Sequence, residues 1–232
     1  MDYTSLPFDS GFCAIQTKLW AKAYSKIHLI KVQLLGQKYI HIDDTQSFAE
    51  DEAQIEITQI ELGSDKSFVN VTSNLAGFNS AFKSDTAYIA KNEQQLDINY
   101  CTEHTGKKTD TKMKIRGTIL DNAKKLYRGT IDFKKGCSGS TGDEQEETLL
   151  ASPTAVNRSL PMILCGEDDV AGSHGGTLGH LNTDELFYFQ SRGIDVEKAK
   201  EIMTRSKVMA VANKIPDSTV IQRIKTFIGE EE

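Results

Sequence analysis

The chain has 232 residues, of which 38% are hydrophobic and 26% charged, and its formal net charge at pH 7 is −6. This composition is typical of a folded, water-soluble protein, and the negative charge argues against a nucleic-acid-binding surface, which needs a basic stripe. No apolar run approaches the roughly 18–20 residues of a membrane span, and the residues after Met1 lack the pattern of a secretory signal. We therefore expect a cytoplasmic protein that binds neither nucleic acid nor membrane.

Short runs of β-favouring, alternating residues fill the sequence from about residue 26 to residue 170, separated by Gly, Asn, Asp and Ser. Strands at intervals of about 8–12 residues are typical of a sandwich, a barrel or a β-solenoid. No intervening segment has the length or period of a crossover helix, which argues against a βαβ fold. The pattern alone leaves sandwich and solenoid open. The clearest runs are 27–32, 54–57, 67–71, 95–100, 112–115, 126–133 and 161–164.

Helical signals replace the strand pattern after residue 180. The landmarks in chain order are a capping-box spacing from Asn182 to Glu185, a left-handed helix end at Gly193, helix starts at Asp195 and at Asp217 or Ser218, and a break at Pro216. We expect the second helix to end near Ala212 and residues 230–232 to form a solvated tail. The sequence thus predicts a β region over 1–180 and a small helical subdomain over 181–232, packed on the end of the β region.

The segment 167–194, EDDVAGSHGGTLGHLNTDELFYFQSRGI, is the most distinctive part of the chain. His174 lies between Ser173 and Gly175, where small neighbours leave the imidazole accessible and the backbone free to turn. A neutral imidazole is a good iron ligand, which makes His174 the candidate metal ligand. The alternative is a histidine that is hydrogen-bonded at the junction between the β region and the helices.

This segment closely resembles the C-terminal signature of the SufB/SufD family, the scaffold proteins of SUF iron–sulfur cluster assembly. Weaker matches continue upstream, so that the resemblance is firm from about residue 95 to residue 203 and faint before that. The matching positions in the signature are Asp168, Asp169, Val170, Ser173, His174, Gly175, Thr177, Gly179, Phe187, Tyr188, Ser191, Arg192, Gly193 and Ile194.

Several positions depart from the family pattern. Gly172 stands where SufD-type members usually have a cysteine, and Gly175 stands where SufB-type members have a glutamate. This end of the chain therefore resembles SufD more than SufB. Upstream, the usual His-x-x-Pro-His-Thr run survives only as His104 and Thr109, and the usual Gln-x-Asn is Glu144-x-Glu146. These replacements argue against further ligands upstream of the signature.

The resemblance implies a right-handed parallel β-helix, in which stacked coils enclose a continuous apolar interior. It also implies that His174 lies at an interface between two β-helices where a transient iron–sulfur cluster forms. Cys165, which precedes the histidine, is the second candidate, because a thiolate beside the histidine would suit such a cluster; the alternative is a buried cysteine that ends an apolar strand. Exposed solenoid edges favour a dimer, either with a second copy or with a SufB-like partner.

The family docks a SufC-like ATPase on its helical subdomain. Phe187, Tyr188 and Arg192 are the candidate contacts, since apolar and aromatic side chains flanked by arginine are common in binding interfaces. Burial of Phe187 and Leu186 against the solenoid is the alternative. The chain has no G-x-x-x-x-G-K-[ST] loop, so we expect it to bind no nucleotide itself, and to be a scaffold component and not an enzyme.

Two other interpretations remain open at this point. A structural homologue would bind the ATPase without cluster chemistry. A β-helix enzyme acting on polysaccharide would need clustered carboxylates, for which Asp97, Glu103, Asp121 and Asp132 are the only loose candidates. The four widely spaced cysteines contain no C-x-x-C pair, which excludes a zinc ribbon, and we expect most of them to be buried free thiols.

Overall fold

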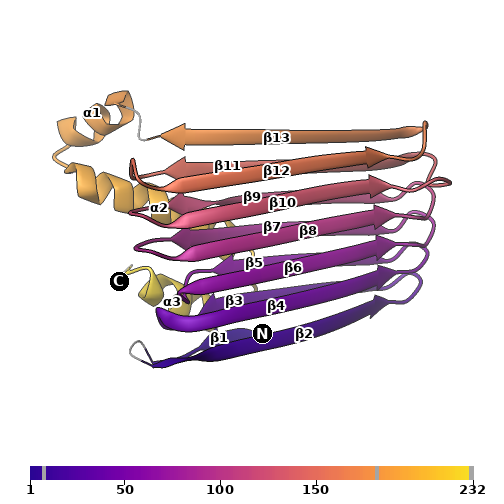
Figure 1. The fold of residues 1–232 in the computed structure, drawn as a ribbon, viewed down its shortest axis with the longest axis horizontal. Helices are drawn as coiled ribbons and strands as arrows, with labels where there is room; N and C mark the ends of the chain where they lie inside the picture. The colour runs from indigo at the N-terminus through magenta and orange to yellow at the C-terminus, as the bar shows by residue number, and fades with distance from the viewer. Residues whose placement is uncertain (7–8, 181–182, 230–232) are drawn as a thin grey trace.

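Thirteen strands alternate between two parallel sheets and are followed by three helices (Figure 1). The computed structural model describes residues 1–6, 9–180 and 183–229, apart from the side chains of residues 183–185. The odd-numbered strands form a seven-stranded sheet and the even-numbered strands a six-stranded sheet. This arrangement confirms a parallel β-helix with a small group of C-terminal helices. The strands are β1 (Asp2–Thr4), β2 (Ser10–Ala21), β3 (Lys26–Leu34), β4 (Lys38–Ala49), β5 (Gln54–Glu61), β6 (Lys66–Leu75), β7 (Ala81–Ala90), β8 (Gln95–His104), β9 (Asp110–Ile119), β10 (Lys124–Phe133), β11 (Ser140–Leu150), β12 (Val156–Cys165) and β13 (Val170–His180).

Each coil of the solenoid contains one strand of each sheet and the turns that join them. Within the odd-numbered sheet, Thr141 of β11 pairs with Asp110 of β9, and Val170 of β13 pairs with Ser140 of β11. The turns stack as the strands do: the amide of Glu52 donates to the carbonyl of Phe78 at 2.8 Å. Left-handed residues with positive φ recur in these turns. The nearly constant coil length thus determines which residues of successive coils are neighbours.

The middle coils enclose an apolar core. Because side chains alternate across a strand, every second residue points inward, and Ile57, Ile98, Ile115 and Ile131 are all at most 3% exposed. Burial of this kind contributes about 25 cal/mol for each Å² of apolar surface removed from water. Stacking of coils on both sides is what buries these residues, which is why the middle of the solenoid is its most apolar part.

Two layers of the interior are polar, and for them the expectation of a continuous apolar interior is wrong. Near the N-terminal coils, the Lys31 ammonium donates to Asp43 at 2.5 Å and to Thr45 at 2.6 Å, and all three side chains are buried. Near the C-terminal coils, the buried Lys125 ammonium forms an ion pair with Glu146. Pairing of opposite charges is what allows these groups to stay inside.

Helices α2 (Val196–Ala212) and α3 (Ser218–Phe227) pack on the outer face of the odd-numbered sheet, and α1 (Thr183–Ser191) contacts α2. Helix α2 contacts β5, β7 and β9, and Val208 and Val211 form a second apolar cluster with Ile60 and Ala87. Figure 1 shows the helices beside the ends where the odd-numbered strands finish. The expectation that the helical subdomain packs on the end of the β region is not met by α2 and α3, because their apolar side chains pack on a sheet face.

The boundaries of the helices largely follow their sequence signals. Gly193 has a φ of +77° after α1, and Asp195 and Asp217 cap α2 and α3 by accepting hydrogen bonds from backbone N–H groups. The proposed capping box from Asn182 to Glu185 and the tail 230–232 lie outside the described residues. None of the helices that the structure describes is long and apolar enough to cross a membrane.

Candidate functional site

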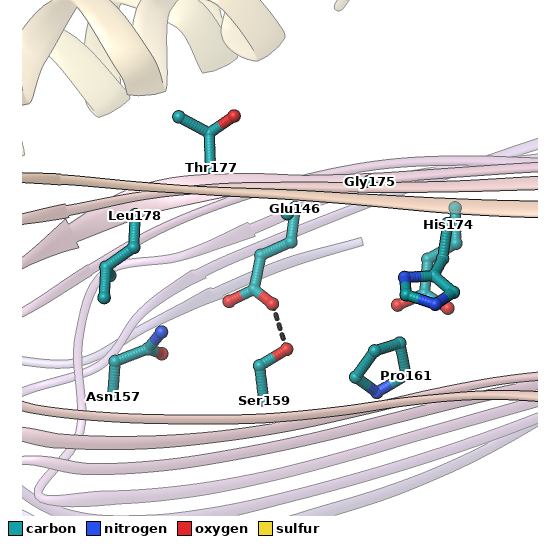
Figure 2. A pocket seen from close by; sticks show the side chains of 10 residues that line it. Glu146, Asn157, Ser159, Pro161, His174, Gly175, Thr177 and Leu178 are labelled. Atoms are coloured by element: carbon teal, nitrogen blue, oxygen red, sulfur yellow. Dashed lines mark hydrogen bonds between the residues drawn. The ribbon is translucent and has the colours of Figure 1, made fainter.

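The last coil of the solenoid has no coil above it. Among the described strands, β13 pairs only with β11 and β12 only with β10, so both lie at the edge of their sheets. Between them opens a cavity of about 320 Å³. Figure 2 shows side chains of β13 and β12 pointing toward each other across it. The residues that line this end cavity are Glu144, Glu146, Asn157, Ser159, Pro161, His174, Gly175, Gly176, Thr177 and Leu178.

The register of β13 on β11 places His174 in the end cavity. His174 pairs with Glu144, which is buried and faces inward, so His174 lies on the inward face one coil higher. In Figure 2 its ring points toward Pro161 of β12. The expected turn at Gly175 and Gly176 is wrong, since both residues lie within β13 and continue its parallel ladder.

The glycines around His174 shape the space near its imidazole. Gly175 and Gly176 have no side chain that could cover the histidine. A Cβ atom at either position would meet nothing within 4 Å, so the space around them is open. At Gly172, by contrast, a Cβ atom would approach Ile163 Cγ2 to 2.9 Å. The glycine that replaces the usual family cysteine therefore lies where a larger residue would require its neighbours to shift.

A buried ion pair forms part of the floor of the end cavity. Glu146 binds the Lys125 ammonium and accepts hydrogen bonds from Ser159 and from Thr148, the latter at 3.0 Å. Burial alone would raise the pKa of Glu146, but Lys125 holds it below its usual range. Glu146 is thus a carboxylate whose charge is already neutralised within the chain.

Glu144 is a second buried carboxyl group with a different environment. Burial raises the pKa of Glu144 to about 7; Glu146 and Asp143 add to this effect, whereas Tyr127 and Lys125 oppose it. The side chain is 2% exposed, and its Oε2 atom has no hydrogen-bond partner among the described residues. Such an oxygen is costly to bury without a partner.

Cys165 does not join His174. Its pairing with the buried Phe133 places it on the inward face of β12, at the end of that strand, and it is exposed. It is outside the lining of the end cavity. On the far side of the turn, His174 lies four residues beyond Val170, a rise of about 13 Å along β13. Cys165 and His174 both lie on inward faces of the solenoid, but they do not form one site. Because Cys165 is exposed, the alternative of a buried cysteine is wrong.

The aromatic residues of α1 form an exposed surface. Phe187 is 71% and Tyr188 58% exposed, and the Arg192 guanidinium carbon lies 5.4 Å from the centre of the Tyr188 ring. Cation–π contacts of this kind hold both groups at the surface. The alternative in which Phe187 is buried against the solenoid is therefore wrong, while Leu186 is half-buried.

Other residues that the sequence analysis singled out form hydrogen bonds, ion pairs or turns within the fold. His104 and Thr109 are indeed neighbours: His104 Nδ1 lies 2.7 Å from Thr109 Oγ1, and its Nε2 lies 2.9 Å from Thr111 Oγ1. Both ring nitrogens of this fully buried histidine are therefore occupied. Asp97 is held by Arg128 at 2.5 Å, and Asp121 lies in a turn with a φ of 52°.

The cysteines and the other potential metal-binding side chains are dispersed over the structure. Cys137 is buried, but Cys13 and Cys101 are half-buried and Cys165 is exposed, so the expectation that most are buried is wrong; all four are free thiols. Among the side chains that the structure describes, no group of three or more His, Cys, Asp and Glu residues could hold a metal ion. A metal site built from the described side chains would therefore have at most two of these ligands.

The sequence analysis did not predict that Lys125, Glu144 and Glu146 lie near His174. Glu144 and Glu146 stand out only as replacements in a family pattern, and Lys125 precedes an otherwise β-favouring run. The available signal is the coil length, because Glu144 precedes His174 by one full coil and pairs with it directly. A search for positions one coil apart would have brought them together.

Comparisons with known proteins agree with this architecture. Residues 1–207 match the family described as "SUF system FeS cluster assembly, SufBD core domain". The chain is 26% identical over 157 residues to the iron–sulfur cluster assembly protein SufD of Bacillus subtilis, covering 68% of this chain and 36% of that protein. It is 28% identical over 169 residues to the chloroplastic SufBD family protein ABCI8 of Arabidopsis thaliana, covering 73% and 30%.

A similar match extends to the SufD protein of Escherichia coli, which is 22% identical over 161 residues, covering 69% of this chain and 38% of that protein. The chain thus spans about a third of the length of these three relatives, whose covered shares are 36%, 30% and 38%. The similarity therefore concerns the β-helical core and not the whole length of the relatives.

Proposed function

Because this chain belongs to the SufB/SufD family of iron–sulfur cluster assembly proteins, we propose that it is a scaffold component of SUF-type assembly. The observation that carries the proposal is the position of His174. It is a potential iron ligand on the inward face of a coil that no described strand covers, and it lines a cavity of about 320 Å³. A transient cluster built from iron and sulfide is the cargo of this site.

A second scaffold subunit is proposed to cover the open coil. The edge strands β12 and β13 carry backbone groups without a partner strand among the described residues, and such edges readily pair with another chain. The outward face of β12 is also apolar, with Leu160, Met162 and Leu164 all exposed. A second copy or a SufB-like protein would bury this edge and enclose His174 between two β-helices.

A SufC-like ATPase is the proposed partner of the helices. The exposed aromatic surface of Phe187 and Tyr188, with Arg192 stacked on it, has the composition of a binding anchor. In this proposal the chain neither binds nucleotide nor acts as an enzyme. The ATPase supplies the motion of the two scaffold subunits, and the complex works in the cytoplasm.

A second candidate function is a structural subunit that binds the ATPase without cluster chemistry. It is favoured by the separation of Cys165 from His174 and by the scarcity of ligands among the described residues. The polysaccharide-acting enzyme has no comparable support, since Asp97 is committed to Arg128 and the family is one of cluster assembly.

Anaerobic reconstitution with ferrous iron and sulfide tests the proposal. We expect the wild-type chain to develop a sulfide-to-iron charge-transfer band that is lost in His174→Ala, with and without a SufC-type ATPase. His180→Ala is the matched control, because His180 is exposed on the same strand and is not part of the cavity lining. ATPase binding without any band would favour the structural subunit, and a band that survives in His174→Ala would contradict the role of this residue.

A further inference from the structure

We propose that Glu144 is a second ligand of ferrous iron, which it binds together with His174 in the end cavity. This inference rests on the proposed function, because it names the chain's own groups that receive the metal before sulfide is added. In the sequence, Glu144 stands out only because it replaces a residue of the usual family pattern. The two side chains would form a half-site, open on the uncovered side of the last coil.

The backbone brings the two side chains together. His174 and Glu144 are register partners on adjacent parallel strands, so their backbones lie about 4.8 Å apart. Both side chains project from the same inward face and both line the end cavity. At this spacing the Glu144 carboxylate and the His174 imidazole can both reach a cation that lies between them.

The floor of the cavity leaves room for the Glu144 carboxylate. A Cβ atom at Gly129, on the facing strand β10, would lie 2.2 Å from Glu144 Oε1 and 2.4 Å from Oε2. Glycine is therefore the residue that lets the carboxylate occupy the centre of the coil. Pro161 follows Gly129 one coil higher and faces the His174 ring, so carboxylate and imidazole are stacked one above the other.

The ion-pair and hydrogen-bond partners of Glu144 and Glu146 determine which of the two carboxylates is available to bind a metal ion. Glu146 is bound by Lys125, Thr148 and Ser159. Glu144 is only 2% exposed, yet its Oε2 has no partner among the described side chains. A buried carboxylate oxygen that lacks a donor and borders an open cavity is suited to a cation that arrives there.

The chemistry of the pair fits a divalent first-row metal such as ferrous iron. Imidazole nitrogen and carboxylate oxygen are both common ligands of ferrous iron in proteins. Because the pair supplies only two ligands, the remaining positions are left for water, for sulfide and for groups of a second scaffold subunit. A half-site of this kind accounts for a scaffold whose described residues contain no larger ligand group.

Anaerobic titration calorimetry with ferrous iron alone tests the inference on the full chain. We expect Glu144→Gln and His174→Ala each to weaken iron binding by at least about tenfold, as loss of a metal-site group does. Glu144→Asp keeps the charge on a shorter arm and should give an intermediate affinity. Glu147→Gln is the control, since Glu147 points outward on the same strand and pairs with Lys207; its iron affinity should equal that of the wild type.

Each outcome bears on a different claim. Wild-type affinity in Glu144→Gln, with its fold verified by circular dichroism and urea unfolding, would overturn the ligand role of Glu144. The proposed function would stand in that case if His174→Ala still abolished the charge-transfer band. Failure of the wild-type chain both to bind ferrous iron and to form a band would overturn the proposed function, and the ligand role with it. Equal weakening in Glu147→Gln would reveal a general charge effect and would also overturn the proposal.

Discussion

The middle coils and the last coil are made of similar strands but have opposite interiors. In the middle coils, Ile98 and Ile131 are sealed by a coil above and a coil below, and both are 0% exposed. In the last coil, Leu178 points into the same interior but is 51% exposed, and His174, four residues earlier on β13, is exposed as well. The difference lies in the number of neighbours, because a solenoid coil is covered only by the coils next to it.

This contrast explains where functional groups can be placed. An unpaired polar group inside the middle coils is costly, and the buried His104 there has a hydrogen-bond partner at each ring nitrogen. The last coil is free of this constraint and can hold the exposed His174 imidazole one coil above Glu144. Three substitutions and a change of pH test this contrast, and their expected effects decrease in the order given.

Removal of the buried cation should be the most damaging change. Lys125→Met leaves Glu146 inside the solenoid without its counter-charge, and we expect a loss of about 3–5 kcal/mol in the free energy of unfolding, measured by urea denaturation. The double variant Lys125→Met with Glu146→Leu should recover at least half of this loss, because it removes both charges. A single variant as stable as the wild type would show that water reaches this layer.

Truncation of a sealed core residue comes next. Ile131→Ala should lower the free energy of unfolding by about 3 kcal/mol, since it removes buried methylene groups and leaves a cavity between two coils. The same urea experiment reports the change. A cost below about 1 kcal/mol would mean that the coils relax around the lost side chain and are not tightly packed.

Acidification should destabilise the middle coils through His104. Burial lowers the pKa of His104 to about 4, below the usual value near 6.5. Between these values the unfolded chain takes up a proton that the folded chain refuses, so the contribution of His104 to stability falls as the pH drops from about 7 to about 4, by up to about 3 kcal/mol. His104→Gln should remove this part of the pH dependence. Identical pH profiles for wild type and His104→Gln would contradict the assignment.

Truncation in the last coil should have the smallest effect. Leu178→Ala removes a side chain that is already half exposed, so we expect a cost under about 1 kcal/mol at low protein concentration. The comparison with Ile131→Ala tests the contrast directly. If the cost of Leu178→Ala increases with protein concentration, a second copy covers the coil in solution; an equally large cost for both variants at any dilution would mean that the last coil is sealed within one chain.

The sequence predicted those parts of the fold that depend on local pattern. Alternating residues identified strands such as β3 and β10, and the caps at Asp195 and Asp217 located two helix starts. The parallel β-helix itself came from the resemblance carried by the segment around His174. Strand β11 is not among the clearest runs, because its inward positions Glu144 and Glu146 are charged and interrupt the alternation of apolar and polar residues.

The candidate site was only half predictable for the same reason. His174 was identified by its small neighbours and its motif, but its partner Glu144 lies one full coil earlier and is determined by the register of β11 on β13. Cys165 was placed near it because a short separation in sequence suggested proximity, whereas Cys165 ends β12 and His174 lies four residues into β13, so the two are separated along the strands. Long-range register in a parallel sheet leaves no local trace in the sequence.

Mössbauer spectroscopy of the chain after anaerobic reconstitution with iron and sulfide tests the central claim most directly, that the open last coil is the site of cluster assembly. We predict a cluster-iron signal in the wild type and in His180→Ala, and its loss in His174→Ala although that variant remains folded. A signal of equal intensity in His174→Ala would place the chemistry elsewhere on the chain and would contradict the claim.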